Sequence, residues 1–151
     1  MREYVDKIKK IFASQNFIRY REANDSLIID SFYTDPVAND HTIGVMIYKT
    51  EDGKLRIDDM KMIDEILDVN DIDLSNSFHK EIVEMLLNAF SLKVEDKHCY
   101  RELYDIDTDY ENIMKNKNAH SYVIENILTF FSGIVAFGKI SEIVNLCTKN
   151  E

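Results

Sequence analysis

The sequence contains few of the residues on which common functional motifs depend. It has four glycines, one proline, two cysteines and no tryptophan among 151 residues. The glycines stand too far apart to form a phosphate-binding loop, which excludes nucleotide binding by that route. Two cysteines are too few for a disulfide framework, and the four histidines lack partners at zinc spacing. The sequence therefore predicts reduced thiols, no cofactor and no metal ion.

Long apolar runs are also missing. The longest, residues 124–135, is interrupted by four polar residues and is too short to span a bilayer. Residues 1–10 have no continuous apolar core of the kind that a signal peptide needs. We therefore expect a cytoplasmic protein that does not bind membranes.

Positive charge is scarce. There are 18 Lys and Arg residues against 28 Asp and Glu, which gives a net charge of -10 and a pI near 4.8. A protein that follows a phosphate backbone needs a basic stripe to release counterions. Direct binding of nucleic acid is thus not expected. The charge is uneven, because residues 1–22 carry net +3 and the remainder carries -13.

A hairpin followed by a helix organises the sequence. Apolar residues alternate with other residues over 43–48, which predicts a strand with one buried face. A charged loop over 51–54 contains a glycine and favours a tight turn, and residues 55–57 continue the alternation. Asp58 or Asp59 can then accept the free amide groups of a helix, whose apolar residues recur at helical spacing.

The same reasoning extends to the whole chain. It predicts further strands over 17–22, 27–33, 92–96 and 99–104, and helices over 2–13, 76–90, 111–118 and from His120, with a break at Gly138. Met85 and Ala89 belong to the predicted buried stripe of the helix over 76–90. We expect one α+β domain over 1–151, with a mostly antiparallel sheet of four to six strands, an N-terminal helix and a helical C-terminal half.

Several of these segments occur in an order that resembles a known family. They are Phe32-Tyr33, Pro36, Asn39-Asp40, and the stretches 43–48, 55–59 and 90–94. From about Ser31 to about Phe137 the chain is similar to the bacterial and phage DUF1828 family. It departs from the family pattern at Met60, which stands where the family usually has a glycine after two aspartates, and this puts a role tied to a sharp turn there in question. The resemblance implies a small cytosolic protein, frequent in phages and mobile elements, with no established activity.

One enzymatic hypothesis takes Asp40, Asp59 and Lys61 as a metal-dependent nuclease site. An acid on one strand followed by Asp-x-Lys on the next can hold a divalent ion and orient a water, as in nucleases of the PD-(D/E)xK type. The alternative is that Asp58 and Asp59 cap a helix, that Asp40 holds a loop and that Lys61 is solvated. We favour the alternative, because an acidic surface would repel the substrate.

A calcium-loop pattern begins at Asp105 and then fails. Acidic residues alternate up to Asp109, but the sixth position is Tyr110 in place of glycine and the twelfth is Asn116 in place of glutamate. We interpret this segment as structural.

An acidic tract follows the hairpin. Its carboxylates are Asp58, Asp59, Asp64, Glu65, Asp68, Asp71 and Asp73, against the single Lys61. Carboxylates at such spacing can imitate a phosphate ladder and occupy the basic groove of a nucleic-acid-binding protein. The alternative is a solvated face of an acidic protein.

The C-terminal helix is unusually aromatic. Phe130, Phe131, Phe137 and Ile134 exceed what one narrow stripe requires, so this helix is either fully buried or shared with a second copy in a homodimer. Burial in the core is the preferred interpretation.

The sequence favours a non-enzymatic phage or mobile-element accessory protein. We expect it to bind a host protein through the acidic tract, as a nucleic-acid mimic or an anti-defence inhibitor. The alternatives are the metal-dependent nuclease and an inert oligomeric scaffold.

Overall fold

The computed structural model describes residues 19–23, 26–38, 40–52, 54–103 and 117–149. Two predicted helices, over 2–13 and over 111–118, fall wholly or largely outside these ranges. The described elements are β1 (Arg19–Ala23), β2 (Ser26–Thr34), β3 (Thr42–Lys49), β4 (Leu55–Asp58), α2 (Met62–Val69), α3 (Ser77–Ala89), β5 (Lys93–Glu95), β6 (His98–Leu103), α5 (Lys117–Phe137) and α6 (Ile140–Lys149).

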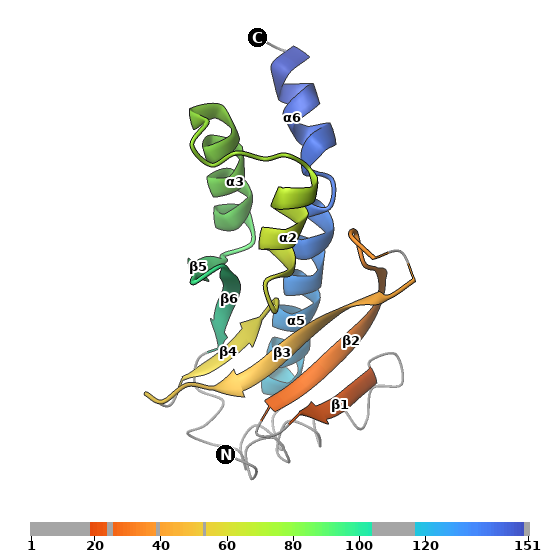
Figure 1. The fold of residues 1–151 in the computed structure, drawn as a ribbon. Helices are drawn as coiled ribbons and strands as arrows, with labels where there is room; N and C mark the ends of the chain where they lie inside the picture. The colour runs from red at the N-terminus through yellow and green to blue at the C-terminus, as the bar shows by residue number, and fades with distance from the viewer. Residues whose placement is uncertain (1–18, 24–25, 39, 53, 104–116, 150–151) are drawn as a thin grey trace.

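The strands form one antiparallel sheet in the order β1-β2-β3-β4-β6-β5. β1 to β4 are a meander, and α2 and α3 then connect β4 to the β5–β6 hairpin, which returns to the sheet with β6 beside β4. Figure 1 shows α5 running behind the sheet, with α2 and α3 beyond the ends of β4 and β6. The prediction of an α+β fold with an antiparallel sheet is confirmed.

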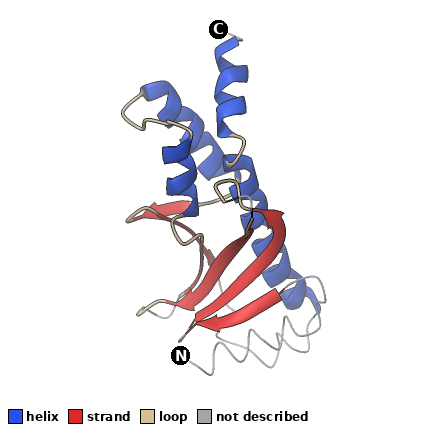
Figure 2. Cartoon of the chain, turned by 45° about the vertical axis from the view of Figure 1, so that its right-hand side comes forward, coloured by secondary structure: helices blue, strands red, loops and turns tan. Residues whose placement is uncertain are grey.

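The core lies between the sheet and α5. Successive strand residues point to opposite faces, and the alternate residues Ile43, Val45 and Ile47 are buried. Figure 2 shows α5 passing along one face of the curved sheet. Its side of the core consists of large residues with exposed fractions of 0–1%, namely Phe130, Phe131, Ile134 and Phe137. The aromatic face is therefore buried within a single copy, as preferred, and these four side chains are not available to a partner.

Gly138 separates α5 from α6, as predicted. A Cβ atom at this position would lie 2.9 Å from Cγ of Pro36, so the β2–β3 loop packs directly against the helix break. No single helix among the described residues has the length and apolar character needed to cross a membrane. Residues 124–137 and 140–148 meet both conditions only when joined, and the two helices are bent by 58°.

The buried stripe of α3 differs from the prediction. The helix buries Ile82, Val83 and Leu86, whereas the side chain of Met85 is 51% exposed and Ala89 is also exposed. The predictions for Met85 and Ala89 are thus wrong. The physical reason is that α3 packs against α5 along a single narrow side, so only part of a broad apolar stripe meets the core.

Candidate functional site

The two aspartates at the end of β4 point to opposite sides of the sheet. Asp59 has an exposed fraction of 0% and faces the core. Its carboxylate accepts hydrogen bonds from three backbone N–H groups, those of Lys61 (3.0 Å), Ile63 (2.7 Å) and Cys99 (2.9 Å). Asp59 therefore accepts a free amide group of the first turn of α2, as predicted, and also ties the start of this helix to β6, while Lys61 stands at the N-cap position itself. Burial raises the pKa of Asp59 to about 6, although the three N–H donors oppose the change.

A sharp turn follows, at Met60 and Lys61. Their φ angles are 55° and 66°, in the left-handed region that favours glycine. Two aspartates hold this turn, because Oδ1 of Asp58 accepts a hydrogen bond from Met60 N (2.7 Å) while Oδ1 of Asp59 accepts that of Lys61 N. Aspartate side chains that bond to the backbone two residues ahead stabilise turns of this kind. The turn thus forms without a glycine.

Asp58 lies on the opposite side and positions a histidine. Its side chain is 5% exposed and contacts His98 Nδ1 through Oδ1 (2.8 Å). Its second oxygen accepts a hydrogen bond from the Tyr48 hydroxyl (3.2 Å). Burial, followed by the charge of Asp58, raises the pKa of Tyr48, so this hydroxyl keeps its proton and remains a donor. The His98 ring is 38% exposed and is held in one orientation by the carboxylate.

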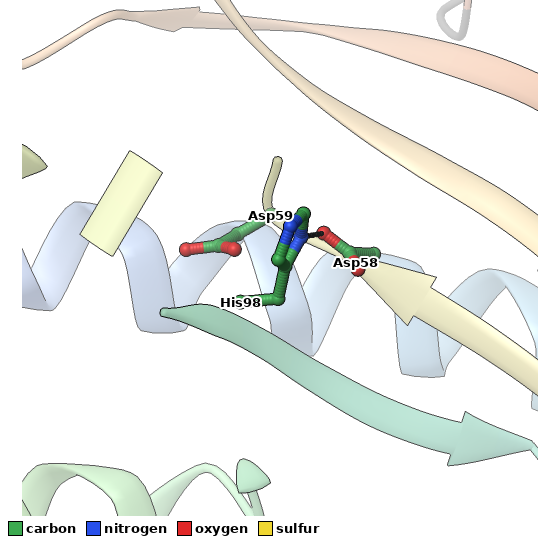
Figure 3. A group of neighbouring side chains, drawn as sticks. All are labelled: Asp58, Asp59 and His98. Carbon is green, nitrogen blue, oxygen red and sulfur yellow. Dashed lines mark hydrogen bonds and ion pairs between the residues drawn. The ribbon is translucent and has the colours of Figure 1, made fainter. Parts of the chain in front are cut away.

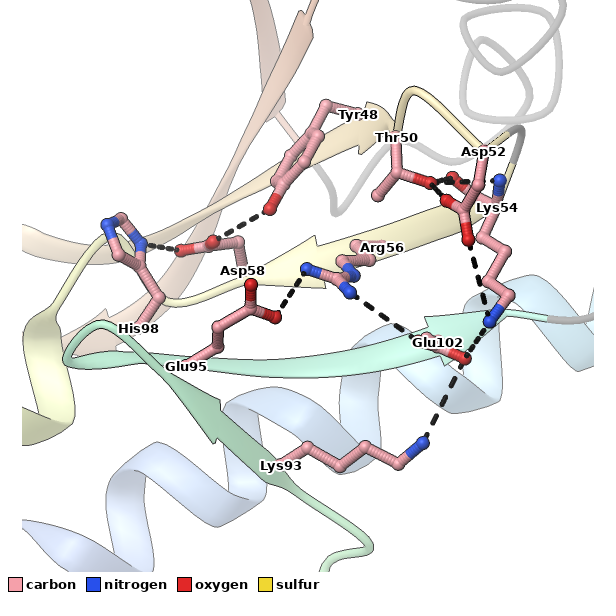
Figure 4. Close-up of polar contacts among 10 residues, drawn as sticks. All are labelled: Tyr48, Thr50, Asp52, Lys54, Arg56, Asp58, Lys93, Glu95, His98 and Glu102. Atoms are coloured by element: carbon pink, nitrogen blue, oxygen red, sulfur yellow. Dashed lines mark hydrogen bonds and ion pairs between the residues drawn. The ribbon is translucent and has the colours of Figure 1, made fainter.

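Figure 4 shows that the same face of the sheet carries a network of charged residues. Arg56 lies over the Tyr100 ring, with Cζ 4.0 Å from the ring centre. Its guanidinium also meets Glu95 (3.3 Å) and Glu102 (3.7 Å). Further ion pairs of 3.9 Å join Glu102 to Lys54 and Lys93. This network joins β4, β5 and β6 across the face opposite α5.

A polar cavity of about 220 Å³ opens on this network. Its lining consists of Tyr48, Arg56, Asp58, Glu95, Asp96, His98 and Tyr100. Asp58 fixes the orientation of the His98 ring in this lining. The lining has no serine or cysteine to act as a nucleophile, and Arg56 is already engaged by two carboxylates. The arrangement is that of an ion-pair network which stabilises the sheet.

One group of described residues has the composition of a metal site. A ligand atom from each of Asp58, Asp59 and His98 lies within 4.8 Å of the other two. Figure 3 shows the His98 ring against the Asp58 carboxylate, and no hydrogen bond joins Asp59 to either of them. The Asp59 oxygens already accept three backbone N–H groups, and Asp58 is bonded to His98. A metal ion would have to replace the contact between Asp58 and His98 and compete with the N–H groups for the Asp59 oxygens, so the residues do not fit one as they stand.

The residues of the nuclease hypothesis lie apart. Asp40 is in the β2–β3 loop with its side chain 84% exposed, and its ion-pair partner is His41 at 3.7 Å. Asp59 is buried and Lys61 is exposed. Asp58, the residue before Asp59, pairs with Met46 of β3. The strand from Met46 back to the β2–β3 loop, which holds Asp40, covers about 13 Å. A divalent ion needs ligand oxygens within about 2.6 Å of itself, and this arrangement does not provide them.

The acidic tract is only partly a surface. Asp58 and Asp59 are inside the protein, which corrects their assignment to a binding face, whereas Glu65, Asp68, Asp71 and Asp73 are exposed and Asp64 is half-buried. The structure adds Glu81 and Glu84 of α3. We call residues 61–84 the acidic helix pair. It carries seven carboxylates and two lysines, a net charge of -5. The spacing of Glu81 and Glu84, on the polar side of a predicted helix, was the available signal for these two residues.

No family model matches the chain, and no curated protein and no solved structure matches it either. The geometry itself defines the class: an α+β protein in which an antiparallel sheet supports an exposed acidic helix pair.

Proposed function

We propose that this is a non-enzymatic protein that binds a basic surface of another protein through the acidic helix pair. The observation that carries the proposal is the placement of charge. A net charge of -5 is concentrated on two consecutive helices and the loop between them, and all but one of these carboxylates are exposed. A field of one sign on one element steers an oppositely charged partner into contact.

The partner in this proposal is a nucleic-acid-binding protein of the host. Its basic groove is built to follow rows of phosphates, and rows of carboxylates on a rigid helix present similar charge. The resemblance to the DUF1828 family adds the biological setting of a phage or mobile-element accessory protein that inhibits a host defence. The left-handed turn at Met60 supports this resemblance, because it is the conformation that a glycine at this position would serve.

The nuclease alternative has less support. The Asp59 carboxylate accepts hydrogen bonds from three backbone N–H groups, and Asp40 lies in a separate loop. The exposed acids would also repel nucleic acid. A catalytic role is therefore not part of the proposal.

The test is a titration against purified bacterial nucleic-acid-binding proteins with basic grooves. Biolayer interferometry measures the binding at 50 and 300 mM NaCl. We expect salt-sensitive association with at least one of them. The triple variant Glu65→Gln, Asp68→Asn, Asp71→Asn removes three exposed charges from the acidic helix pair. It should weaken binding about tenfold, if each rim charge contributes about 0.5 kcal/mol.

A matched control shows whether binding depends on where the removed charges lie or only on the total charge of the protein. The triple variant Glu51→Gln, Glu125→Gln, Glu142→Gln removes the same charge from exposed residues elsewhere, and should leave binding within about twofold of the wild type. Equal losses in the two triple variants, or a complete lack of salt-sensitive association, would contradict the proposal.

A further inference from the structure

An apolar groove lies between α2, α3 and the β5–β6 hairpin. Its volume is about 220 Å³. The apolar lining consists of Ile63, Leu67, Leu74, Val83, Leu87, Val94 and Cys99, and the charged lining of Asp64, Lys80, Glu84 and Lys97. The groove is therefore enclosed by the acidic helix pair on two sides and by the hairpin on the third.

The groove has a buried floor and exposed walls. Ile63, Val83 and Cys99 are 1–5% exposed, whereas Leu74 is 49% exposed and Val94 is 53% exposed. Burial raises the pKa of the Cys99 thiol, so this residue is a neutral part of the floor. Covering the two aliphatic walls would remove apolar surface from water, which is favourable. The space is suited to one large apolar side chain.

Hydrogen bonds hold the loop that carries Leu74, one of the two exposed walls, in place. In the α2–α3 loop, Ile72 N donates to Leu67 O (2.9 Å) and Asp73 N lies 3.1 Å from His79 Nδ1. The Asn76 side chain caps α3 by accepting from two backbone N–H groups, at 3.0 and 3.2 Å. A pocket that is already ordered loses little conformational entropy on binding, which increases affinity.

The four charged residues of the lining balance, two acids against two lysines, so the charge that selects an occupant is that of the acidic helix pair around the groove. Among the lining residues, Lys80 is engaged by Glu84 at 3.9 Å. Leu74, one of the two exposed walls, follows Asp71 and Asp73 in the loop, and both of these aspartates are exposed. An apolar group flanked by positive charges therefore matches the site. A fatty acid would bring a carboxylate to this surface, and a second copy would bring the same acidic face, so both are disfavoured.

We propose that this groove binds an aliphatic or aromatic anchor side chain in a basic segment of the partner protein. The inference rests on the proposed function and adds the recognition chemistry. Most of the binding energy in an interface comes from a few anchors in such pockets, while surrounding charges contribute to association rate and specificity. The acidic helix pair steers the partner, and the groove retains it.

The experiment uses the full chain and a fluorescein-labelled helical peptide made of leucine and lysine as the probe. A second peptide has serine in place of leucine and the same charge. Binding is measured by fluorescence anisotropy at 150 mM NaCl. The groove variant is Leu74→Ser with Val94→Ser, both at exposed positions. The matched control is Leu128→Ser with Leu146→Ser, which are 39% and 62% exposed and lie outside the groove.

We expect the groove variant to bind the leucine peptide about tenfold or more weakly than the wild type does, since it removes the apolar contacts of an anchor. Its affinity for the serine peptide should be unchanged. The control variant should bind both peptides within twofold of the wild type, and circular dichroism should show the same fold in all variants.

Other results separate the two proposals. If the groove variant binds like the wild type while the triple variant of the acidic helix pair loses affinity, the anchor inference is overturned and the proposed function stands. If only the groove variant loses affinity, the anchor is supported and the acidic basis of the function fails. If sedimentation shows self-association that the groove variant abolishes, without binding of either peptide, the occupant is a second copy and the inference is overturned.

Discussion

At the left-handed turn after Asp59, glycine should make the protein more stable than alanine does, which is the opposite of the usual order. Met60 has a φ angle of 55°. For a residue with a Cβ atom this conformation costs about 1–2 kcal/mol. For glycine the conformation costs little, but glycine is more flexible in the unfolded chain, and its greater loss of conformational entropy on folding costs about 0.5–1 kcal/mol. Met60→Gly should therefore be more stable than Met60→Ala by about 0.5–1 kcal/mol.

The comparison with alanine is necessary because the Met60 side chain is only 37% exposed. Both variants lose the same buried part of this side chain, so their difference isolates the backbone. The assay is urea denaturation followed by circular dichroism, which gives the free energy of unfolding of each variant. In a protein of this size the difference corresponds to about 1–4 °C in Tm.

Glu81 supplies the control. It is exposed within the right-handed helix α3, where glycine is less stable than alanine by about 1 kcal/mol. The glycine variant should thus be the more stable one at position 60 and the less stable one at position 81. If alanine were the more stable residue at both positions, the turn would not have the strain described here.

Three further predictions concern stability. The folded-state pKa of Asp59, about 6, lies above its ordinary value of 3.8, so the contribution of Asp59 to stability is largest at low pH and is lost as the pH rises through 6. Between pH 7.5 and pH 5 the unfolding free energy of the wild type should rise by about 1.5 kcal/mol relative to that of Asp59→Asn. A difference between the two proteins that stays constant with pH would contradict this. Gly138→Ala should lower the unfolding free energy by about 1–3 kcal/mol through overpacking against Pro36, and an unchanged urea midpoint would show that the two segments do not touch. Asn76→Ala should cost about 1 kcal/mol because it removes the cap of α3, whereas Asn76→Asp should retain most of the stability.

The parts of the fold that depend on local pattern follow from the sequence. Ile43, Val45 and Ile47 alternate with other residues and lie in β3, Asn76 caps α3, and Asp59 binds a free amide group of α2. Gly138 interrupts the C-terminal helix where a weak helix former is expected to do so. Periodicity and capping act over a few residues, so a sequence contains enough information to place them.

The site depends on pairings that no local pattern encodes. Asp58 meets His98, 40 residues further along the chain, only because β6 and not β5 lies beside β4. The same pairing brings Cys99 N to Asp59. Neighbouring aspartates therefore look alike in the sequence and yet face opposite sides of the sheet, both of them buried. Likewise, Met85 is exposed because of the side on which other elements pack against α3, and the sequence of α3 alone does not determine that side.

The connection between β4 and β6 has a further consequence. Every residue that lines the apolar groove lies between Ile63 and Cys99, in the stretch that leaves the sheet after β4 and returns to it with the β5–β6 hairpin. Loops and helices inserted between neighbouring strands can change while the strands keep their pairing. Substitutions at the exposed residues of this stretch would thus alter the partner that is bound, while its buried residues, such as Ile63 and Ile82, keep their places in the core.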